Sequence, residues 1–489
     1  MRLRYRNTIV AVIAAVAVMG TTGCEKFLDV NQNPNSPKTA TDNLILPSTQ
    51  ATIGMVVGNN LQIFGGIYAQ YWTQNPTSSQ YKTIDQYQSN PATFDRMWGL
   101  MYNDALQDLL LLEQSKNSNY VAIALLEKAY VFQLLTDAFG DVPLKEALRG
   151  TSGLSPAYDP QQEVYDSIFA WTKRGIALTT VATSNYPGSD DLVFGGGAAG
   201  MANWKRFGNT FLLRAYLRLS EVDPNKAKAG IQALYATNPA FLTTDAKIAY
   251  RNEGGNQHPL YAEGASPTLN RTQNLVASAT AVNAFVANND PRLKVLYTTN
   301  AAGNVVSIPQ GSFATQPTVA PTFPAPITGG RFSAATAAVA AAAPVKLISA
   351  PESYFLQAEA VARGWAPAGD VNELFKAGIK ASFDTYAISA ADYNTYINSA
   401  PDARLPADVA GRIRAIITQK YYAMNGTQGF EAWTEWRRTG YPDILVKSQA
   451  STLGTNDLPA RLLYPETEIT RNQKFPGVKL VTEKVWWDK

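Results

Sequence analysis

The segment from residue 71 to residue 88 combines aromatic rings with side-chain amides and a carboxylate. Its members are Tyr71, Trp72, Gln74, Asn75, Gln80, Tyr81, Asp85, Gln86, Tyr87 and Gln88. Sugars have flat apolar faces that stack on aromatic rings, while their hydroxyls need amide and carboxylate partners. The segment therefore predicts a ligand-binding loop, with candidate contacts Trp72, Tyr81, Tyr87, Asp85 and Gln80. The alternative is that these rings cover the edge of the core or contact a partner protein.

A second polar loop, at residues 250–270, contributes Tyr261 and Asn256 as further candidate contacts. It also contains His258, the single histidine of the chain, in the sequence Asn-Gln-His-Pro that is typical of a surface loop. With one histidine and one cysteine, metal sites rich in these residues are excluded and a histidine-based catalytic triad is disfavoured. We expect His258 to be a polar surface residue.

Carboxylates alone do not decide whether the protein is an enzyme. A glycoside hydrolase needs two facing carboxylates, which the 39 acidic residues could supply at many spacings. Their number is therefore no evidence for hydrolysis, and a secreted glycoside hydrolase stays as an alternative.

The N-terminus has the features of a lipoprotein export signal. Arginines at positions 2, 4 and 6 precede an uncharged stretch at residues 8–20 that is too short to span a bilayer. Thr21, Thr22 and Gly23 then lead into Cys24, the only cysteine, although bacterial lipoproteins usually carry Leu where Thr21 stands. We expect cleavage before Cys24 and its lipidation, with an ordinary secretory signal as the alternative.

Charge and cysteine content exclude two further classes. The net charge of +3 disappears with the three arginines of the signal, so the mature chain lacks the basic excess of nucleic-acid-binding proteins. A single cysteine excludes an intramolecular disulfide framework. We predict a signal peptide at 1–23, a lipidated tether at 24–43 and a single helical domain at 44–489.

Hydrophobic periodicity predicts a mainly α-helical fold. The expected helices cover 94–114, 120–139, 159–180, 204–221, a helix starting at Asp223-Pro224, 352–364, 370–386, 390–399 and 408–424. Gly140 is expected to end the second helix, and Asp159 to cap the third before proline. Short turns between consecutive helices favour antiparallel pairs, as in helical repeats, and small residues at 358, 360, 362 and 364 would allow close packing.

Long irregular stretches separate these helices at 71–93, 184–203, 240–272 and 298–350. Such loops are uncommon in compact domains unless they are functional or disordered. The part at 309–344 is biased to Ala, Pro and Thr, and we interpret it as surface padding.

Four segments of the chain carry distinctive motifs: CEKFLDVNQNPN at 24–35, PESYFLQAEAVARGW at 351–365, GFEAWTEWRRTGYP at 429–442 and RLLYPETEITRN at 461–472. Together they resemble the SusD/RagB family of Bacteroidota, in its SusD-like branch. These motifs occur in family order from end to end of the mature chain. Thr21 and the alanine-rich stretch at 334–343 depart from the family pattern.

The resemblance implies an all-α fold of tetratricopeptide-like helix pairs, with minor β hairpins and a long-loop ligand face. It implies a binding protein without catalytic activity that delivers a glycan to a partner TonB-dependent outer-membrane transporter. The protein would be lipid-anchored in the outer membrane, facing the cell exterior. A peptide or glycopeptide ligand is the alternative within the family. No cofactor is expected, and nothing in the sequence supports a structural calcium ion.

The charged residues of the matching motifs are expected to be structural. Glu435 and Arg438 have the i, i+3 spacing of a pair on one helix. Beside Trp433 and Trp436, we expect them to belong to a partly buried polar network that holds a helix end. Arg437 is expected to bond Asp443 or loop carbonyls. Glu352, Glu359 and Glu373 are interpreted as helix-face or capping residues.

Overall fold

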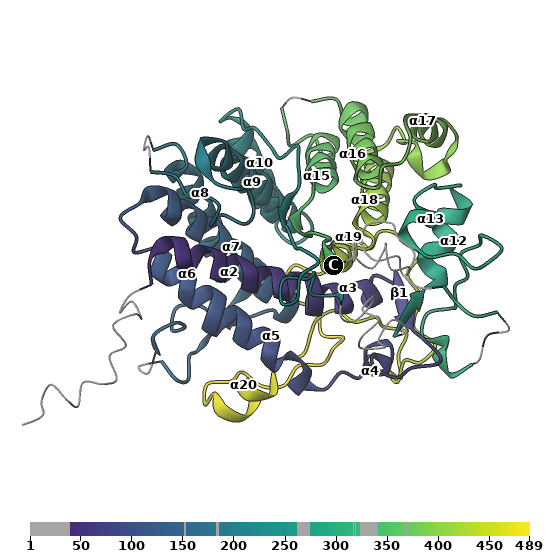
Figure 1. Cartoon of the computed structure of the whole chain (residues 1–489), viewed down its shortest axis with the longest axis horizontal. Coiled ribbons are helices and arrows are strands. Elements are labelled where there is room, and N and C mark those ends of the chain that lie inside the picture. Colours follow the sequence, from purple (N-terminus) through teal and green to yellow (C-terminus); the bar gives the residue numbers. More distant parts are fainter. Residues whose placement is uncertain are drawn as a thin grey trace, which may run out of the picture. The chain divides into compact units, whose positions relative to one another are not determined.

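All residues of helix α7 (Ser118–Phe139) except Ser118 and Lys128 are buried. It packs against α8 (Gln161–Leu178) and α9 (Gly197–Arg218), and α9 packs in turn against α10 (Pro224–Tyr235) (Figure 1). The computed structural model describes residues 40–150, 153–181, 185–261, 274–315, 317, 319–322, 341–367 and 369–489. The predicted signal peptide, Cys24 and most of the predicted tether therefore lie outside the described residues.

The remaining elements follow in chain order. The helices are α2 (Asp42–Val56), α3 (Gln62–Tyr68), α4 (Lys82–Asp85), α5 (Asp95–Gly99), α6 (Gln107–Leu112), α12 (Ala279–Ala287), α13 (Leu293–Leu296), α15 (Ala350–Ala362), α16 (Val371–Thr385), α17 (Ala390–Ser399), α18 (Val409–Met424), α19 (Gly429–Thr439) and α20 (Glu466–Arg471). Short 3₁₀ segments are η2 (Pro91–Phe94), η5 (Ser312–Ala314) and η6 (Pro401–Ala403), and π-helical segments are η1 (Val57–Leu61) and η3 (Leu100–Leu106). The predicted all-α fold of consecutive helix pairs is confirmed.

The strands among the described residues form short antiparallel pairs. β1 (Trp72–Gln74) pairs with β5 (Leu275–Ala277), β2 (Val142–Pro143) with β3 (Tyr158–Asp159), and β4 (Ala246–Ile248) with β6 (Val345–Ile348). Two of these pairs join segments about 100 or 200 residues apart in the sequence, rather than the neighbouring strands of a hairpin. They tie the long loops to the helical scaffold.

Glycines set the distance between α7, α8 and α9. A Cβ atom on Gly175 would lie 2.9 Å from the Leu126 side chain, and one on Gly208 would lie 2.5 Å from Ile176. Larger residues at these positions would push the three helices apart. Gly140, with φ of +84°, ends α7 as the sequence predicts.

An equally close contact joins helices from opposite ends of the chain. A Cβ atom on Gly65 in α3 would lie 2.0 Å from the backbone nitrogen of Phe430 in α19, and one on Gly429 would lie 2.5 Å from the backbone nitrogen of Gly66. The two backbones therefore touch, and only glycine fits on either side.

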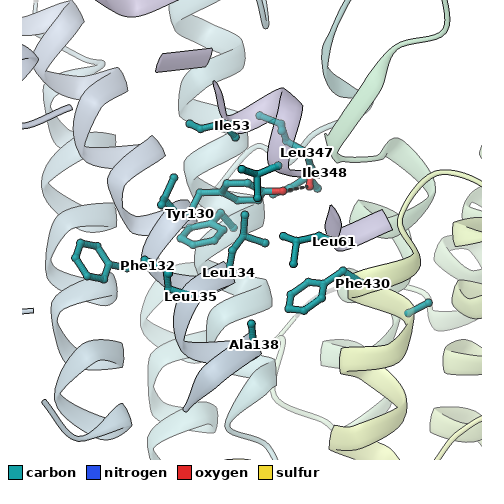
Figure 2. Packing of buried hydrophobic residues seen from close by; sticks show 14 of the residues in the cluster. Ile53, Leu61, Tyr130, Phe132, Leu134, Leu135, Ala138, Leu347, Ile348 and Phe430 are labelled. Carbon is teal, nitrogen blue, oxygen red and sulfur yellow. Dashed lines mark hydrogen bonds between the residues drawn. The ribbon is translucent and has the colours of Figure 1, made fainter. Parts of the chain in front are cut away.

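The core beside α7 gathers side chains from distant elements. Figure 2 shows Ile53 of α2, Leu61 of η1, Leu134 of α7, Leu347 of β6 and Phe430 of α19 converging around Tyr130. The Tyr130 hydroxyl donates a hydrogen bond to the Leu347 carbonyl oxygen at 3.2 Å. The phenol is thus satisfied inside an otherwise apolar cluster.

Several local predictions need correction. Asp159 does not cap α8, because it lies in β3 and its carboxylate accepts bonds from the backbone nitrogens of Leu144 and Lys145, each at 2.9 Å. Asp141 accepts from the first nitrogen of α8 instead. The single helix expected at 94–114 is divided into α5, the π-helical η3 and α6.

The packing of α15 and α16 confirms one part of the small-residue prediction and corrects another. Ala358, Ala360 and Ala362 are buried in α15 against its neighbours, as predicted. Gly364 has open space around it and ends the helix at φ of +68°. The close approach depends instead on Gly378 of α16, where a Cβ atom would lie 2.6 Å from the Phe355 ring.

Candidate functional site

The predicted binding segment 71–88 is folded against the scaffold. Trp72 lies in β1 opposite Ala277 of β5, and only 2% of its surface is exposed. Its ring faces Gly66 of α3, where a Cβ atom would lie 2.5 Å from the indole. The ring faces are therefore covered by the protein and present no stacking surface in this conformation.

Asp85 organises this segment from beneath. Its carboxylate accepts hydrogen bonds from Thr73 Oγ1 at 2.9 Å, the Gln74 backbone nitrogen at 2.7 Å and Gln310 Nε2 at 2.6 Å. Thr73 Oγ1 accepts in turn from the backbone nitrogen of Gly311 at 2.9 Å. We call Thr73, Gln74, Asp85, Gln310 and Gly311 the Asp85 cluster.

Burial raises the pKa of Asp85 to about 6, against the three hydrogen bonds, which favour the carboxylate. The cluster holds segment 71–88 to residues 310–311, and no local pattern in the sequence predicts this connection. The interpretation of 309–344 as padding is wrong at its start, since Gln310 is buried and hydrogen-bonded. Most of the remaining stretch lies outside the described residues.

The two predicted tyrosines are also buried. The Tyr87 hydroxyl accepts from the backbone nitrogen of Ser448 at 3.0 Å, and its ring packs on Tyr68 with centroids 6.1 Å apart. Tyr81 donates from its backbone nitrogen to Gln74 Oε1 at 2.6 Å. Of the five candidates in this segment, Gln80 alone is exposed. Both tyrosines fix the shape of the loop.

The second predicted loop differs in its burial. Asn256 is exposed and Tyr261 half-buried, and their backbone bonds are local to residues 251–261. His258 is not a surface residue, because only 4% of it is exposed and its backbone nitrogen donates to the Ala341 carbonyl at 2.8 Å. Its Nδ1 accepts from the backbone nitrogen of Leu260 at 3.0 Å, and burial lowers the pKa of the imidazole to about 3.

The charged motif residues form a buried ion-pair network, as predicted. Arg438 bonds Glu435 Oε2 at 2.6 Å within α19 and both oxygens of Glu359 in α15 at 2.8 Å. Arg218 of α9 bonds Glu431 at 2.6 Å and also contacts Glu435. Burial opposes ionisation of Glu435, but Arg438, Lys420 and Arg218 outweigh it and hold its pKa well below the usual range.

A second arm of the ion-pair network reaches Glu352. Its carboxylate lies 3.3 Å from Arg214 and accepts from Gln428 at 2.6 Å. Burial raises the pKa of Glu352, although Arg214 and Lys420 act against it. Glu373 is exposed on α16, as expected for a helix-face residue. The network joins the helix pairs, and its members are buried.

Arg437 donates to one loop carbonyl oxygen, that of Ala460 at 2.9 Å, and to the carbonyl oxygen of Asp137 in the last turn of α7 at 2.7 Å. Its guanidinium lies 3.8 Å from the centre of the Trp433 ring. The alternative partner, Asp443, pairs with Arg414 instead. Arg437 therefore anchors the end of α19 to the C-terminal segment.

The described residues contain neither a candidate metal centre nor a candidate membrane-spanning helix. In that part of the chain, no cluster of three or more His, Cys, Asp or Glu side chains could hold a metal ion. No helix there is long and apolar enough to cross a membrane.

A family profile matches residues 34–465 and is described as SusD-like, starch-binding and associating with the outer membrane. The chain belongs to the SusD-like family. This membership accounts for the order of the four motifs and for the helical scaffold beneath the loops. A comparison with curated protein sequences gives no match.

Solved structures of the SusD-like fold superpose on most of the chain. One, described as a chitin-binding protein, is 25% identical with a TM-score of 0.74, covering 92% of this chain and 100% of its own. A chitin-binding SusD homologue from Flavobacterium johnsoniae is 23% identical with a TM-score of 0.71, covering 91% and 98%. A SusD homologue from Bacteroides fragilis is 19% identical with a TM-score of 0.74, covering 92% and 100%. The latter two similarities establish the fold.

Proposed function

We propose that this SusD-like protein binds a glycan at the outer membrane and passes it to a TonB-dependent transporter without cleaving it. The observation that carries the proposal is the family match across residues 34–465. The 25% identical structure described as a chitin-binding protein makes β-linked amino sugars the first ligands to test. Lipidation at Cys24 and an outward orientation belong to the same proposal.

The proposed contact surface is the exposed side of segment 71–88, which we call the 71–88 face. Its exposed side chains are Thr77, Ser79, Gln80, Thr83 and Gln88. Trp72, Tyr81, Tyr87 and Asp85 support this face from beneath, and Gln80 contacts the ligand directly. Asn256 and Tyr261 are proposed as additional contacts because they are at least partly accessible.

The test uses the soluble chain beginning at residue 25 in affinity gel electrophoresis with chitin derivatives, starch and other polysaccharides. Retardation by one polysaccharide, without release of reducing ends, supports the proposal. Binding of peptides alone would replace the ligand class, and release of reducing ends would indicate a hydrolase.

The site assignment needs variants that leave the core intact. We expect Gln80→Ala with Gln88→Ala to weaken retardation several-fold. Gln232→Ala, at an exposed glutamine of α10, is the matched control. Equal retardation of both proteins would move the site away from the 71–88 face.

A further inference from the structure

A separate cleft of about 260 Å³ lies between η3, residues 143–150 and 153–156, and α20. Its lining includes Trp98, Tyr102, Asn103, Gln107, Arg149 and Glu468, and we call it the Trp98 cleft. None of these residues belongs to segment 71–88, to residues 250–261 or to the ion-pair network. The sequence patterns predict no binding site at these residues.

Two aromatic rings form one wall of the Trp98 cleft. The rings of Trp98 and Tyr102 lie 4.8 Å apart at 39° to each other, and Tyr158 lies 6.4 Å from Trp98 in a stacked arrangement. The Tyr102 hydroxyl donates to the Pro143 carbonyl oxygen at 2.7 Å, which fixes the ring. Only 6% of Trp98 and 7% of Tyr102 are exposed, so the two rings give the cleft a fixed apolar wall without an open stacking face.

Polar groups of several kinds surround this wall. Asn103 is exposed and Gln107 half-buried, and both carry amides that donate and accept hydrogen bonds. Glu468 is held by bonds that its Oε2 accepts from the Tyr158 hydroxyl and Asn472 Nδ2, both at 2.8 Å. Arg149 donates to the Lys145 carbonyl oxygen at 2.6 Å. Amides, a carboxylate and a guanidinium beside an apolar wall are the partners that a hydroxyl-rich ring requires.

The backbone around the cleft departs from regular geometry on two sides. Tyr102 and Asn103 lie in the π-helical η3, and π-helical turns inside α-helices occur frequently at functional sites. Leu148, also in the lining, has φ of +61°, a left-handed conformation that is unfavourable for leucine. A π-helical turn on one side of the cleft and a left-handed leucine on the other are both features that occur at binding sites.

We propose that the Trp98 cleft binds one or two sugar rings, as a second glycan site separate from the 71–88 face. Its volume is slightly below the usual range of small-molecule sites, which start at about 300 Å³, so it suits a short saccharide unit better than a long polymer stretch. The proposal rests on glycan binding as the function of the protein.

Calorimetry with maltose and N,N′-diacetylchitobiose tests the cleft. Asn103→Trp places a bulky ring in its mouth, while Asp104→Trp adds the same ring at the neighbouring exposed position outside the lining. We expect at least one disaccharide to bind the unmodified protein. Asn103→Trp should weaken its binding at least tenfold and Gln107→Ala several-fold, with Asp104→Trp within twofold of the original.

Polysaccharide retardation of the same variants separates the two proposals. If retardation persists while neither disaccharide binds, or binds equally to Asn103→Trp and Asp104→Trp, the cleft proposal is overturned and the proposed function stands. If the unmodified protein binds no glycan in either experiment, both proposals fall.

Discussion

Gln310 donates a hydrogen bond from Nε2 to the buried carboxylate of Asp85 at 2.6 Å, although the two residues are 225 positions apart. This contact joins the predicted binding segment to a stretch with no helical periodicity. Buried polar contacts between loops therefore help to hold the loop face, beside the packed rings of Trp72 and Tyr87. Single hydrogen bonds among these contacts can be removed by substitution.

Gln310→Ala should lower the free energy of unfolding by about 1–3 kcal/mol, because the buried Asp85 oxygen loses its donor. Chemical denaturation at pH 7 measures the change. Gln88→Ala, at an exposed glutamine, is the control and should have little effect. Equal stability of both variants would show that water replaces Gln310 without cost.

Glu127→Gln should stabilise the protein at neutral pH. Glu127 is buried in α7, and burial together with the charge of Asp191 raises its pKa well above the usual range. A raised folded-state pKa gives stability below the unfolded pKa that is lost as pH rises through the folded value, at about 1.4 kcal/mol per pH unit. When the free energy of unfolding is measured by denaturation at pH 5 and at pH 8, its decrease between the two should be smaller in Glu127→Gln than in the unmodified protein. A larger loss in the variant would contradict the assignment.

The single histidine offers a direct test of burial. The pKa of His258 is lowered to about 3, so the imidazole stays neutral in the folded protein at pH 5. NMR follows its ring signals without ambiguity, because the chain contains one histidine. We expect no titration between pH 7.5 and pH 5.

The same shift has a consequence for acid stability. A depressed folded-state pKa gives stability above the unfolded value of 6.5 that is lost as pH falls toward about 3, at about 1.4 kcal/mol per pH unit. His258→Gln should remove this part of the acid sensitivity. Ring signals titrating near pH 6.5 would instead place the loop in solvent.

Arg438→Met should be among the most damaging single substitutions. It leaves the carboxylates of Glu359 and Glu435 buried without their shared cation, at a cost of about 3–5 kcal/mol. Arg414→Met breaks an ion pair with Asp443 whose side chains are 56% and 53% exposed, and should cost at most about 1 kcal/mol. Similar midpoints of urea denaturation for the two variants would contradict a structural role for the motif.

The sequence was sufficient to predict features that depend only on residues close together in the chain, such as helix ends and pairs within one helix. The Asp223 side chain accepts from the Lys226 nitrogen at 3.0 Å and starts α10, as the Asp-Pro pair predicts. The pairing of Glu435 with Arg438 also follows from helical spacing alone. The same applies to the end of α7 at Gly140.

The burial of Trp72, Tyr81 and Tyr87 could not be predicted in this way. An aromatic residue in a polar loop looks the same in the sequence whether its ring faces solvent or a partner strand. Here the decision depends on β5 and on residues near 448, which are remote in the chain. Asp159 failed as a cap for the same reason, because a nearer carboxylate, Asp141, occupies the position in space.

The backbone contact of Gly65 and Gly66 with Gly429 links the start of the scaffold to its last long helix. Helix α3 precedes α19 by more than 350 residues, so this contact closes only when nearly the whole chain has been synthesised. Trp72 packs on Gly66 beside this contact, and the Tyr87 hydroxyl accepts its hydrogen bond from Ser448, which lies beyond α19 in the chain. The loop face therefore depends on contacts near the end of the chain, and a chain that stops before α19 would have most of its helix pairs but no complete loop face.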